Sequence, residues 1–223
     1  MVLCDFDGTI TTNDLAELVL DKFAQGDWKA IDAKFEQGKI SLEECLKKEF
    51  ALVKASKEQM LFAVEEEVAF RPGLEKLAFY CKEKNVPLII VSAGIDFIIN
   101  HLLKRQKWEE LVETYMPHVT VTEEGMNFTF PKILQDGSVN FKHDLVRQYK
   151  SKDVRVVYIG DGTGDFAAAR EADIAFAIKG SKLENLCQKY NVPCKSIVDF
   201  RIVLDTIHEM IVSYQKRVSG FSE

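Results

Sequence analysis

The sequence predicts an α/β fold in which helices wrap a parallel sheet and a helical segment is inserted after the first strand. Short apolar runs at residues 1–4, 86–91, 154–159 and 174–177 are typical of strands buried on both faces. A helical pattern follows each of the last three runs, which is the alternation expected of a parallel sheet. Between the first and second runs the pattern is almost wholly helical, so this segment is expected to lie outside the sheet.

The inserted segment contains clear signals for helices. Apolar residues recur at helical spacing over residues 14–24, and capping-box sequences beginning at Ser41 and Ser56 each precede another helical pattern. Helices in this position can form a cap that covers the strand ends and excludes water. The expected domain boundaries are 14–70 for the helical cap and 1–13 with 71–223 for the core.

The second half of the chain adds smaller elements to the core. Residues 118–122 and 126–130 are predicted as strands joined at Glu123-Glu124-Gly125. The pair Asp136-Gly137 is typical of a hairpin turn. The last predicted elements are helices at 181–190 and 199–214.

Two carboxylates come directly after the first strand. Asp5 and Asp7 flank Phe6, and Gly8 permits the chain to turn before Thr9. Ligands of open α/β sheets bind at the carboxyl ends of strands, where one acid can attack phosphorus as a nucleophile and the other can move protons. Two acids in a small space repel each other, which favours Mg²⁺ as a partner. Taken alone, the segment is also compatible with a strand-end turn bearing solvated acids.

Polar groups follow the second and third strands as well. The segment 92–94 (Ser92, Ala93, Gly94) precedes a helix, whose free N–H groups and the serine hydroxyl can form an anion pocket. The third strand is followed by Asp161 and Asp165, two more acids suited to holding a metal. Lys142 lies between these two strands, which favours a phosphate contact over the solvated charge that a lone lysine usually carries.

Taken in order, these four segments resemble the four motifs of the haloacid dehalogenase superfamily of phosphatases. The resemblance extends from Asp5 to about Lys179 and implies a Rossmann-like core. The position of the helical insertion and the segment 70–74 resemble the phosphoserine phosphatase-like branch. Within that branch the sequence is similar to phosphatases of methionine salvage that act on a keto-enol phosphate, and to uncharacterised relatives.

The resemblance implies Mg²⁺-dependent hydrolysis of a phosphate monoester through an aspartyl-phosphate. It implies that Asp5 is the nucleophile and Asp7 the general acid and base. Mg²⁺ would be held by Asp5, the Asp7 carbonyl and Asp161, and Asp165 would support the metal or orient Lys142. The residues implied to bind substrate are Thr9, Asp14, Ser92, Ala93, Gly94 and Lys142.

The substrate stays open at this point. The branch has a glutamate where this chain has Asp14 and an arginine in the cap where it has Glu49, which implies that phosphoserine binds poorly. A methionine-salvage keto-enol phosphate is one candidate, and phosphoserine is an alternative. A phosphotransferase that uses an alcohol acceptor would carry the same motifs. A non-enzymatic binding protein is less favoured because Asp5, Asp7 and Asp161 are all present.

Composition limits the partners of the chain. Its 223 residues carry a formal net charge of −6 and a pI of about 5.4, which argues against nucleic acids and anionic membranes. The five cysteines are scattered without a CxxC pair, as in reduced cytoplasmic proteins. No signal peptide or membrane-spanning run is recognisable. We expect a cytoplasmic monomer or homodimer that binds Mg²⁺ and a small phosphorylated metabolite.

Overall fold

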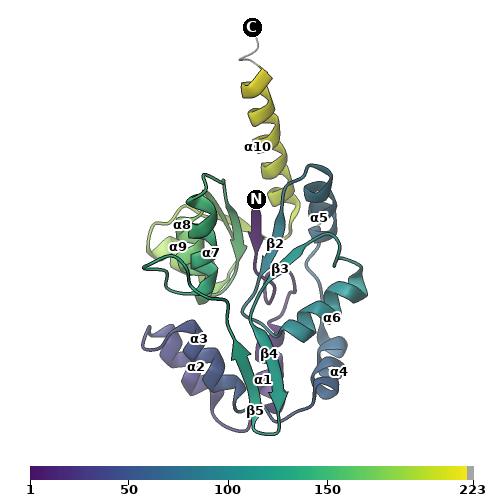
Figure 1. Ribbon diagram of the computed structural model, residues 1–223, viewed down its shortest axis with the longest axis vertical. Helices are drawn as coiled ribbons and strands as arrows, with labels where there is room; N and C mark the ends of the chain where they lie inside the picture. The colour runs from purple at the N-terminus through teal and green to yellow at the C-terminus, as the bar shows by residue number, and fades with distance from the viewer. Residues whose placement is uncertain (220–223) are drawn as a thin grey trace.

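A six-stranded parallel sheet lies at the centre of the protein, with helices on both of its faces (Figure 1). The computed structural model describes residues 1–219. The strand order is β3-β2-β1-β6-β7-β8, so the first strand, which Asp5 directly follows, is in the interior of the sheet. This arrangement confirms the predicted fold class. The strands of the sheet are β1 (Val2–Cys4), β2 (Leu88–Val91), β3 (Glu113–Tyr115), β6 (Val157–Gly160), β7 (Ile174–Ile178) and β8 (Lys195–Ile197).

The sequence does not predict the two edge strands, β3 and β8. In β3 the side chains of Glu113 and Thr114 are exposed, and in β8 those of Lys195 and Ser196 are exposed. Neither strand contains the apolar run that indicates burial on both faces. Polar side chains at a sheet edge also discourage pairing with other chains.

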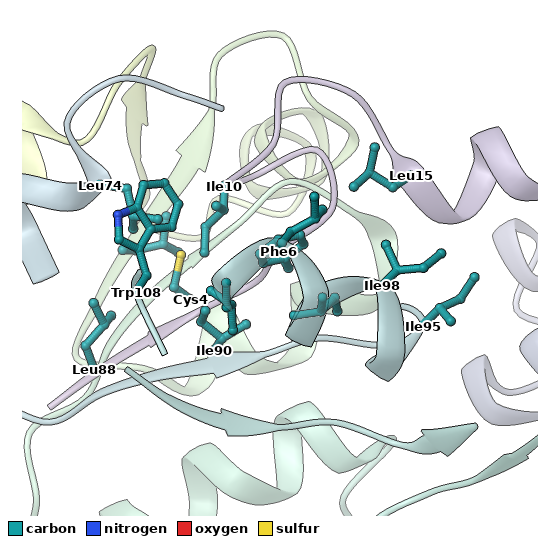
Figure 2. Packing of buried hydrophobic residues seen from close by; sticks show 14 of the residues in the cluster. Cys4, Phe6, Ile10, Leu15, Leu74, Leu88, Ile90, Ile95, Ile98 and Trp108 are labelled. Carbon is teal, nitrogen blue, oxygen red and sulfur yellow. The ribbon is translucent and has the colours of Figure 1, made fainter. Parts of the chain in front are cut away.

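Two layers of helices cover the sheet (Figure 1). Successive strand residues point to opposite faces, so Cys4 and Ile90 pack in one hydrophobic cluster while Leu3 and Ile89 pack in another. Figure 2 shows the first cluster, which includes Cys4, Ile90 and Trp108. The helices on that face are α5 (Leu74–Glu83), α6 (Asp96–Gln106) and α10 (Arg201–Ser219). The helices on the opposite face are α7 (Phe141–Lys150), α8 (Phe166–Glu171) and α9 (Lys182–Lys189), preceded by the 3₁₀ turn η1 (Thr163–Asp165).

Four helices from the inserted segment lie together at one end of the sheet (Figure 1). Ser41 accepts a hydrogen bond from the Glu44 N–H, and Ser56 forms a complete capping box with Gln59, so both predicted helix starts are confirmed. The helices are α1 (Leu15–Phe23), α2 (Trp28–Glu36), α3 (Leu42–Phe50) and α4 (Lys57–Glu67).

A β-hairpin from the second half of the chain packs against this helical group. Its strands are β4 (His118–Thr122), as predicted, and β5 (Gly125–Thr129), which begins and ends one residue before the predicted strand. The rings of Phe50 and Phe128 lie 5.0 Å apart. Gly125 has a φ of +127°, and any side chain there would collide with the Ala51 carbonyl. The hairpin therefore adds a second, distant chain segment to the helical group.

The predicted hairpin turn at Asp136-Gly137 is wrong. The chain does turn here, with the Ser138 N–H donating to the Gln135 carbonyl. However, no strand of the described residues flanks the turn, which instead leads into α7. A glycine-containing turn signal indicates a reversal of the chain and does not by itself require strands on either side.

The state of the cysteines matches the reduced thiols that the sequence predicts. All five cysteines are free, and four of them are buried while Cys194 is partly exposed. Among residues 1–219, no helix combines the length and the apolar character needed to cross a bilayer.

Candidate active site

The carboxyl ends of β1, β2 and β6 open into a cavity of about 480 Å³ that the helices of the inserted segment line on the other side. Cavities of this size hold small molecules. All of the predicted site residues except Thr9 line it, namely Asp5, Asp7, Asp14, Ser92, Ala93, Gly94, Lys142, Asp161 and Asp165. The structure thus brings together residues from four separate parts of the sequence.

Asp5 continues the line of β1, because its N–H donates to the Ile159 carbonyl at 2.9 Å. The side chain is only 5% exposed. Its Oδ1 accepts a hydrogen bond from Lys142 Nζ at 2.7 Å, and its Oδ2 lies 3.4 Å from the Thr9 hydroxyl. Burial raises the pKa of Asp5 to about 7, against the opposing effect of Lys142. A carboxylate held this firmly and facing a cavity can act as a nucleophile.

Asp7 lies beyond Phe6, and its Oδ1 accepts the Leu15 N–H at 3.2 Å. Burial raises the pKa of Asp7 well above its ordinary value, and the negative charges of Asp14 and Asp5 raise it further. A side chain at Gly94 would collide with the Asp7 carboxylate, so glycine is needed there. A carboxyl group that keeps its proton near neutral pH can donate it to a leaving oxygen.

Lys142 is a buried cation between two carboxylates. It is 4% exposed and donates hydrogen bonds of 2.7 Å to Asp5 Oδ1 and to Asp165 Oδ1. Burial acts to lower the pKa of Lys142, but Asp165 and Asp5 raise it above its ordinary value. The ammonium group is therefore charged at neutral pH, as a contact to a phosphoryl group requires.

Both carboxylate oxygens of Asp165 are occupied. Its Oδ1 accepts from Lys142 and from the Tyr158 hydroxyl, each at 2.7 Å. Its Oδ2 accepts the N–H groups of Asp161 at 3.1 Å and Gly162 at 2.9 Å. Of the two roles predicted for Asp165, this geometry favours orienting Lys142 over direct metal binding.

The carboxylates can accommodate a divalent cation. One oxygen from each of Asp5, Asp161 and Asp165 lies within 4.8 Å of the others. Burial raises the pKa of Asp161 to about 8, and the charges of Asp5 and Asp165 add to the shift. A cation would offset this repulsion, and carboxylate oxygens suit Mg²⁺. Gly8 leaves room beside them, because its φ is +69° and a side chain would collide with Asp161.

Thr9 does not lie where its predicted role, substrate binding, would place it. The residue is fully buried and its hydroxyl lies 3.0 Å from Asp161 Oδ1, behind the carboxylates and outside the cavity lining. This position favours holding Asp5 and Asp161 over binding substrate. Ser92, by contrast, lines the cavity and its Oγ accepts the Gly94 N–H at 2.9 Å, so its hydroxyl proton can be donated to a ligand oxygen.

Three supporting residues are missed by the sequence reasoning. Arg71 donates to the carbonyls of Thr9 and Gly8, each at 2.8 Å, and so fixes the loop after β1. Asn140 caps α7 through the His143 N–H and donates to the Gly164 carbonyl at 2.9 Å, joining the Lys142 helix to the Asp161 loop. The third residue is Tyr158, whose hydroxyl donates to Asp165. Its only local signal in the sequence is a phenol group inside an apolar strand.

The wall of the cavity opposite the strand ends carries acids and apolar side chains. Asp14 caps α1 by accepting the Glu17 N–H at 2.8 Å, and burial raises its pKa. Glu49, on α3, also lines the cavity although it is 4% exposed. Trp28, Phe35 and Phe50 line the cavity too.

Two acids of the inserted helices reach across to the core. The Glu36 carboxylate of α2 accepts the single hydrogen of the Thr163 hydroxyl, whose oxygen lies 2.9 and 3.0 Å from the two carboxylate oxygens, and a hydrogen bond from Lys182 Nζ at 2.9 Å. Glu43 of α3 accepts the Phe141 N–H at 3.3 Å, one residue before Lys142. These contacts hold the helices against the loops that carry the site.

Comparison with known proteins shows which proteins this chain resembles. The chain is 31% identical over 220 residues to 2-hydroxy-3-keto-5-methylthiopentenyl-1-phosphate phosphatase of Geobacillus kaustophilus, with 95% of this chain and 97% of the relative covered. It is 28% identical over 245 residues to polyol phosphate phosphatase PYP1 of Saccharomyces cerevisiae, with 100% and 98% covered. A substrate-bound phosphoserine phosphatase structure has the same fold, with a TM-score of 0.69, 18% identity and 92% and 96% of the two chains covered.

The haloacid dehalogenase-like hydrolases match this chain over residues 2–170, which include all four predicted motifs. The predicted family and enzyme class, a phosphomonoester hydrolase of this type, are therefore confirmed. The strand-end carboxylates, the buried lysine and these matches together show that the chain belongs to the haloacid dehalogenase-like hydrolase family.

Proposed function

We propose that this hydrolase is a Mg²⁺-dependent phosphatase that cleaves a small-molecule phosphate monoester through a phosphorylated Asp5. The observation that carries the proposal is the contact of 2.7 Å between Asp5 Oδ1 and Lys142 Nζ at the base of the cavity. A nucleophilic carboxylate next to a fixed cation is suited to attack on an anionic phosphoryl group.

In the first step, an Asp5 carboxylate oxygen attacks phosphorus. The bond between phosphorus and the ester oxygen breaks, and the leaving oxygen takes the proton of Asp7, so the alcohol departs neutral. Lys142 and Ser92 hold the phosphoryl oxygens during the transfer. The raised pKa of Asp7 supports this role, because the acid must be protonated when the substrate arrives.

In the second step, water hydrolyses the phosphorylated Asp5. Asp7, now a carboxylate, takes a proton from the water as its oxygen attacks phosphorus. The bond from phosphorus to Asp5 breaks, which restores the carboxylate and releases inorganic phosphate. Mg²⁺ held by Asp5, Asp161 and the Asp7 carbonyl would neutralise charge on the transferred group. Residues 14–70 would act as the cap that shields both steps from bulk water.

For the substrate, we propose a phosphorylated small metabolite, with the methionine-salvage keto-enol phosphate as the first candidate. The name of the Geobacillus kaustophilus relative supports this choice. A polyol phosphate is the second candidate, supported by the name of the yeast relative. The test is phosphate release from both, from phosphoserine and from an aryl phosphate, with and without an added alcohol. Phosphorylated alcohol among the products would instead indicate a phosphotransferase.

Removal of Mg²⁺ is expected to stop turnover. EDTA should abolish phosphate release and added Mg²⁺ should restore it, because the cation offsets the charges of Asp5 and Asp161. Mg²⁺ should also raise the thermal unfolding temperature of the wild type, and it should raise that of Asp161→Asn much less. Turnover that survives exhaustive chelation would contradict the proposed metal role.

Glu36→Gln is expected to weaken the closed position of the cap. The change removes the ion pair with Lys182, which is partly exposed and so contributes on the order of 1 kcal/mol or less. We expect KM to rise up to about fivefold with little change in kcat, and the difference to shrink at high salt. Steady-state kinetics of this variant beside Glu66→Gln, an exposed change in α4, would measure it. Equal KM values for both variants would show that the contact between Glu36 and Lys182 does not hold the cap closed.

A further inference from the structure

The wall of the cavity that faces the strand ends is strongly acidic. Five of its lining residues are acids from the cap, namely Asp14, Glu17, Asp32, Glu36 and Glu49. Lys182 of α9 lines the cavity from the core side, but it donates to Glu36 at 2.9 Å and lies 3.9 Å from Asp32, so its charge is already shared. The part of a substrate that reaches this wall therefore meets excess negative charge.

Glu49 stands out among these acids. It is 4% exposed, and its Oε1 atom is buried with no hydrogen-bond partner among residues 1–219. The carboxylate accepts a hydrogen bond from the thiol of Cys45, one helical turn earlier on α3. A buried oxygen without a partner costs free energy unless a ligand satisfies it.

We infer that Glu49 selects the substrate by accepting a hydrogen bond from a hydroxyl of a neutral leaving group and by repelling leaving groups that carry a carboxylate. The inference rests on the proposed function, because it concerns the alcohol that the phosphatase releases. Trp28 and Phe35 line the cavity with Glu49, so the same leaving group has an apolar portion. Glu49 is thus a binding residue that the reaction steps on Asp5 and Asp7 do not use.

A hydroxyl fits Glu49 better than an ammonium group does. Burial raises the pKa of Glu49 to about 7, and Asp32, Asp14 and Glu17 contribute to the shift. The side chain is therefore partly protonated near neutral pH. The geometry points the same way: Glu49 offers one unpartnered oxygen, which the single hydrogen of a hydroxyl satisfies, whereas an ammonium group brings three hydrogens that each need an acceptor.

A hydroxyl also fits better than a metal ion. One ligand atom from each of Asp32, Cys45 and Glu49 lies within 4.8 Å of the others, which is the spacing of a candidate cation site. However, Cys45 keeps its proton, since burial raises its pKa and Glu49 accepts the thiol hydrogen. A metal-binding cysteine must be a thiolate.

The test uses matched alkyl phosphates of three and five carbons whose far end is a methyl, a hydroxyl, an ammonium or a carboxylate group. With saturating Mg²⁺, the wild type is expected to favour the hydroxyl over the methyl compound about tenfold in kcat/KM. It is expected to disfavour the carboxylate by about the same factor. Glu49→Leu should abolish the hydroxyl preference, and Glu49→Gln should raise kcat/KM for the carboxylate toward that of the methyl compound.

Glu44→Gln is the matched control, because Glu44 is an exposed acid on the same helix that pairs with Lys48. It should leave all ratios unchanged. Hydrolysis of every compound without discrimination would overturn this inference and leave the proposed function intact. No hydrolysis of any phosphate ester would instead refute the proposed function. A wild-type preference for the ammonium compound, or Zn²⁺ inhibition that Cys45→Ser removes, would also overturn the hydroxyl assignment.

Discussion

Asp5→Asn is expected to lower phosphate release by at least about 10⁴-fold, because an amide oxygen cannot form the acyl-phosphate. The change preserves the size of the side chain, and the hydrogen bond from Lys142 can still be accepted by the amide oxygen. The fold should therefore persist. The measurement is phosphate release from an aryl phosphate, together with the thermal unfolding temperature of the same sample.

The matched control for this prediction is Asp205→Asn, an exposed aspartate on α10. It should retain wild-type turnover. Acid quenching during turnover should trap phosphate on the wild-type protein and none on Asp5→Asn. Normal turnover by a folded Asp5→Asn protein would remove Asp5 from the nucleophile role.

Lys142→Met is expected to lower the free energy of unfolding by about 3–5 kcal/mol, since it leaves Asp5 and Asp165 buried without their cation. Turnover should be lost as well, because no charged group would hold the phosphoryl oxygens. Denaturant unfolding of the variant measures the first effect. Lys150→Met is the matched control on the same helix, where the lysine is 32% exposed and pairs with Asp173. Its cost should be about 1 kcal/mol or less.

The destabilisation of Lys142→Met should depend on pH. Lys142 lowers the pKa of Asp5, so its removal raises that pKa further above about 7. In the unfolded chain the same carboxyl ionises near its ordinary value of about 4. The folded variant therefore holds an extra proton, and its free energy of unfolding falls as pH rises through this window. A loss that is equal at pH 5 and pH 8 would show that the cost does not arise from the stranded carboxylates.

The sequence predicts the central strands and the cap helices because each has a local signature. Residues 88–91 form an uninterrupted apolar run, and Ser56 with Gln59 has the spacing of a capping box. The edge strands β3 and β8 lack such signatures, since a strand open to solvent has no need of apolar residues. The turn at Asp136-Gly137 shows the reverse case, in which a local signal is correct but the inferred strands are absent.

The acids of the candidate site could be predicted for a similar reason. Asp5 and Asp161 directly follow β1 and β6, Asp7 comes two residues after Asp5, and strand ends meet at one edge of a parallel sheet. Their chemistry therefore follows from local position. Arg71 and Tyr158 carry no comparable signal, because they act by bonding to Gly8 and Asp165 in parts of the chain that only folding brings near.

The sequence by itself determined the fold class, the order of the motifs and the chemical type of the site, since these depend on periodicity and on residues at strand ends. Only the tertiary structure decided the roles within the site. Asp5 and Lys142 are 137 residues apart, yet their contact sets the charge of the cavity floor. Whether Thr9 lies behind the carboxylates, whether Asp165 has a free oxygen and whether Glu49 lacks a partner are decided by packing between distant segments. A one-dimensional pattern does not specify such contacts, because each depends on distances and directions among several elements at once.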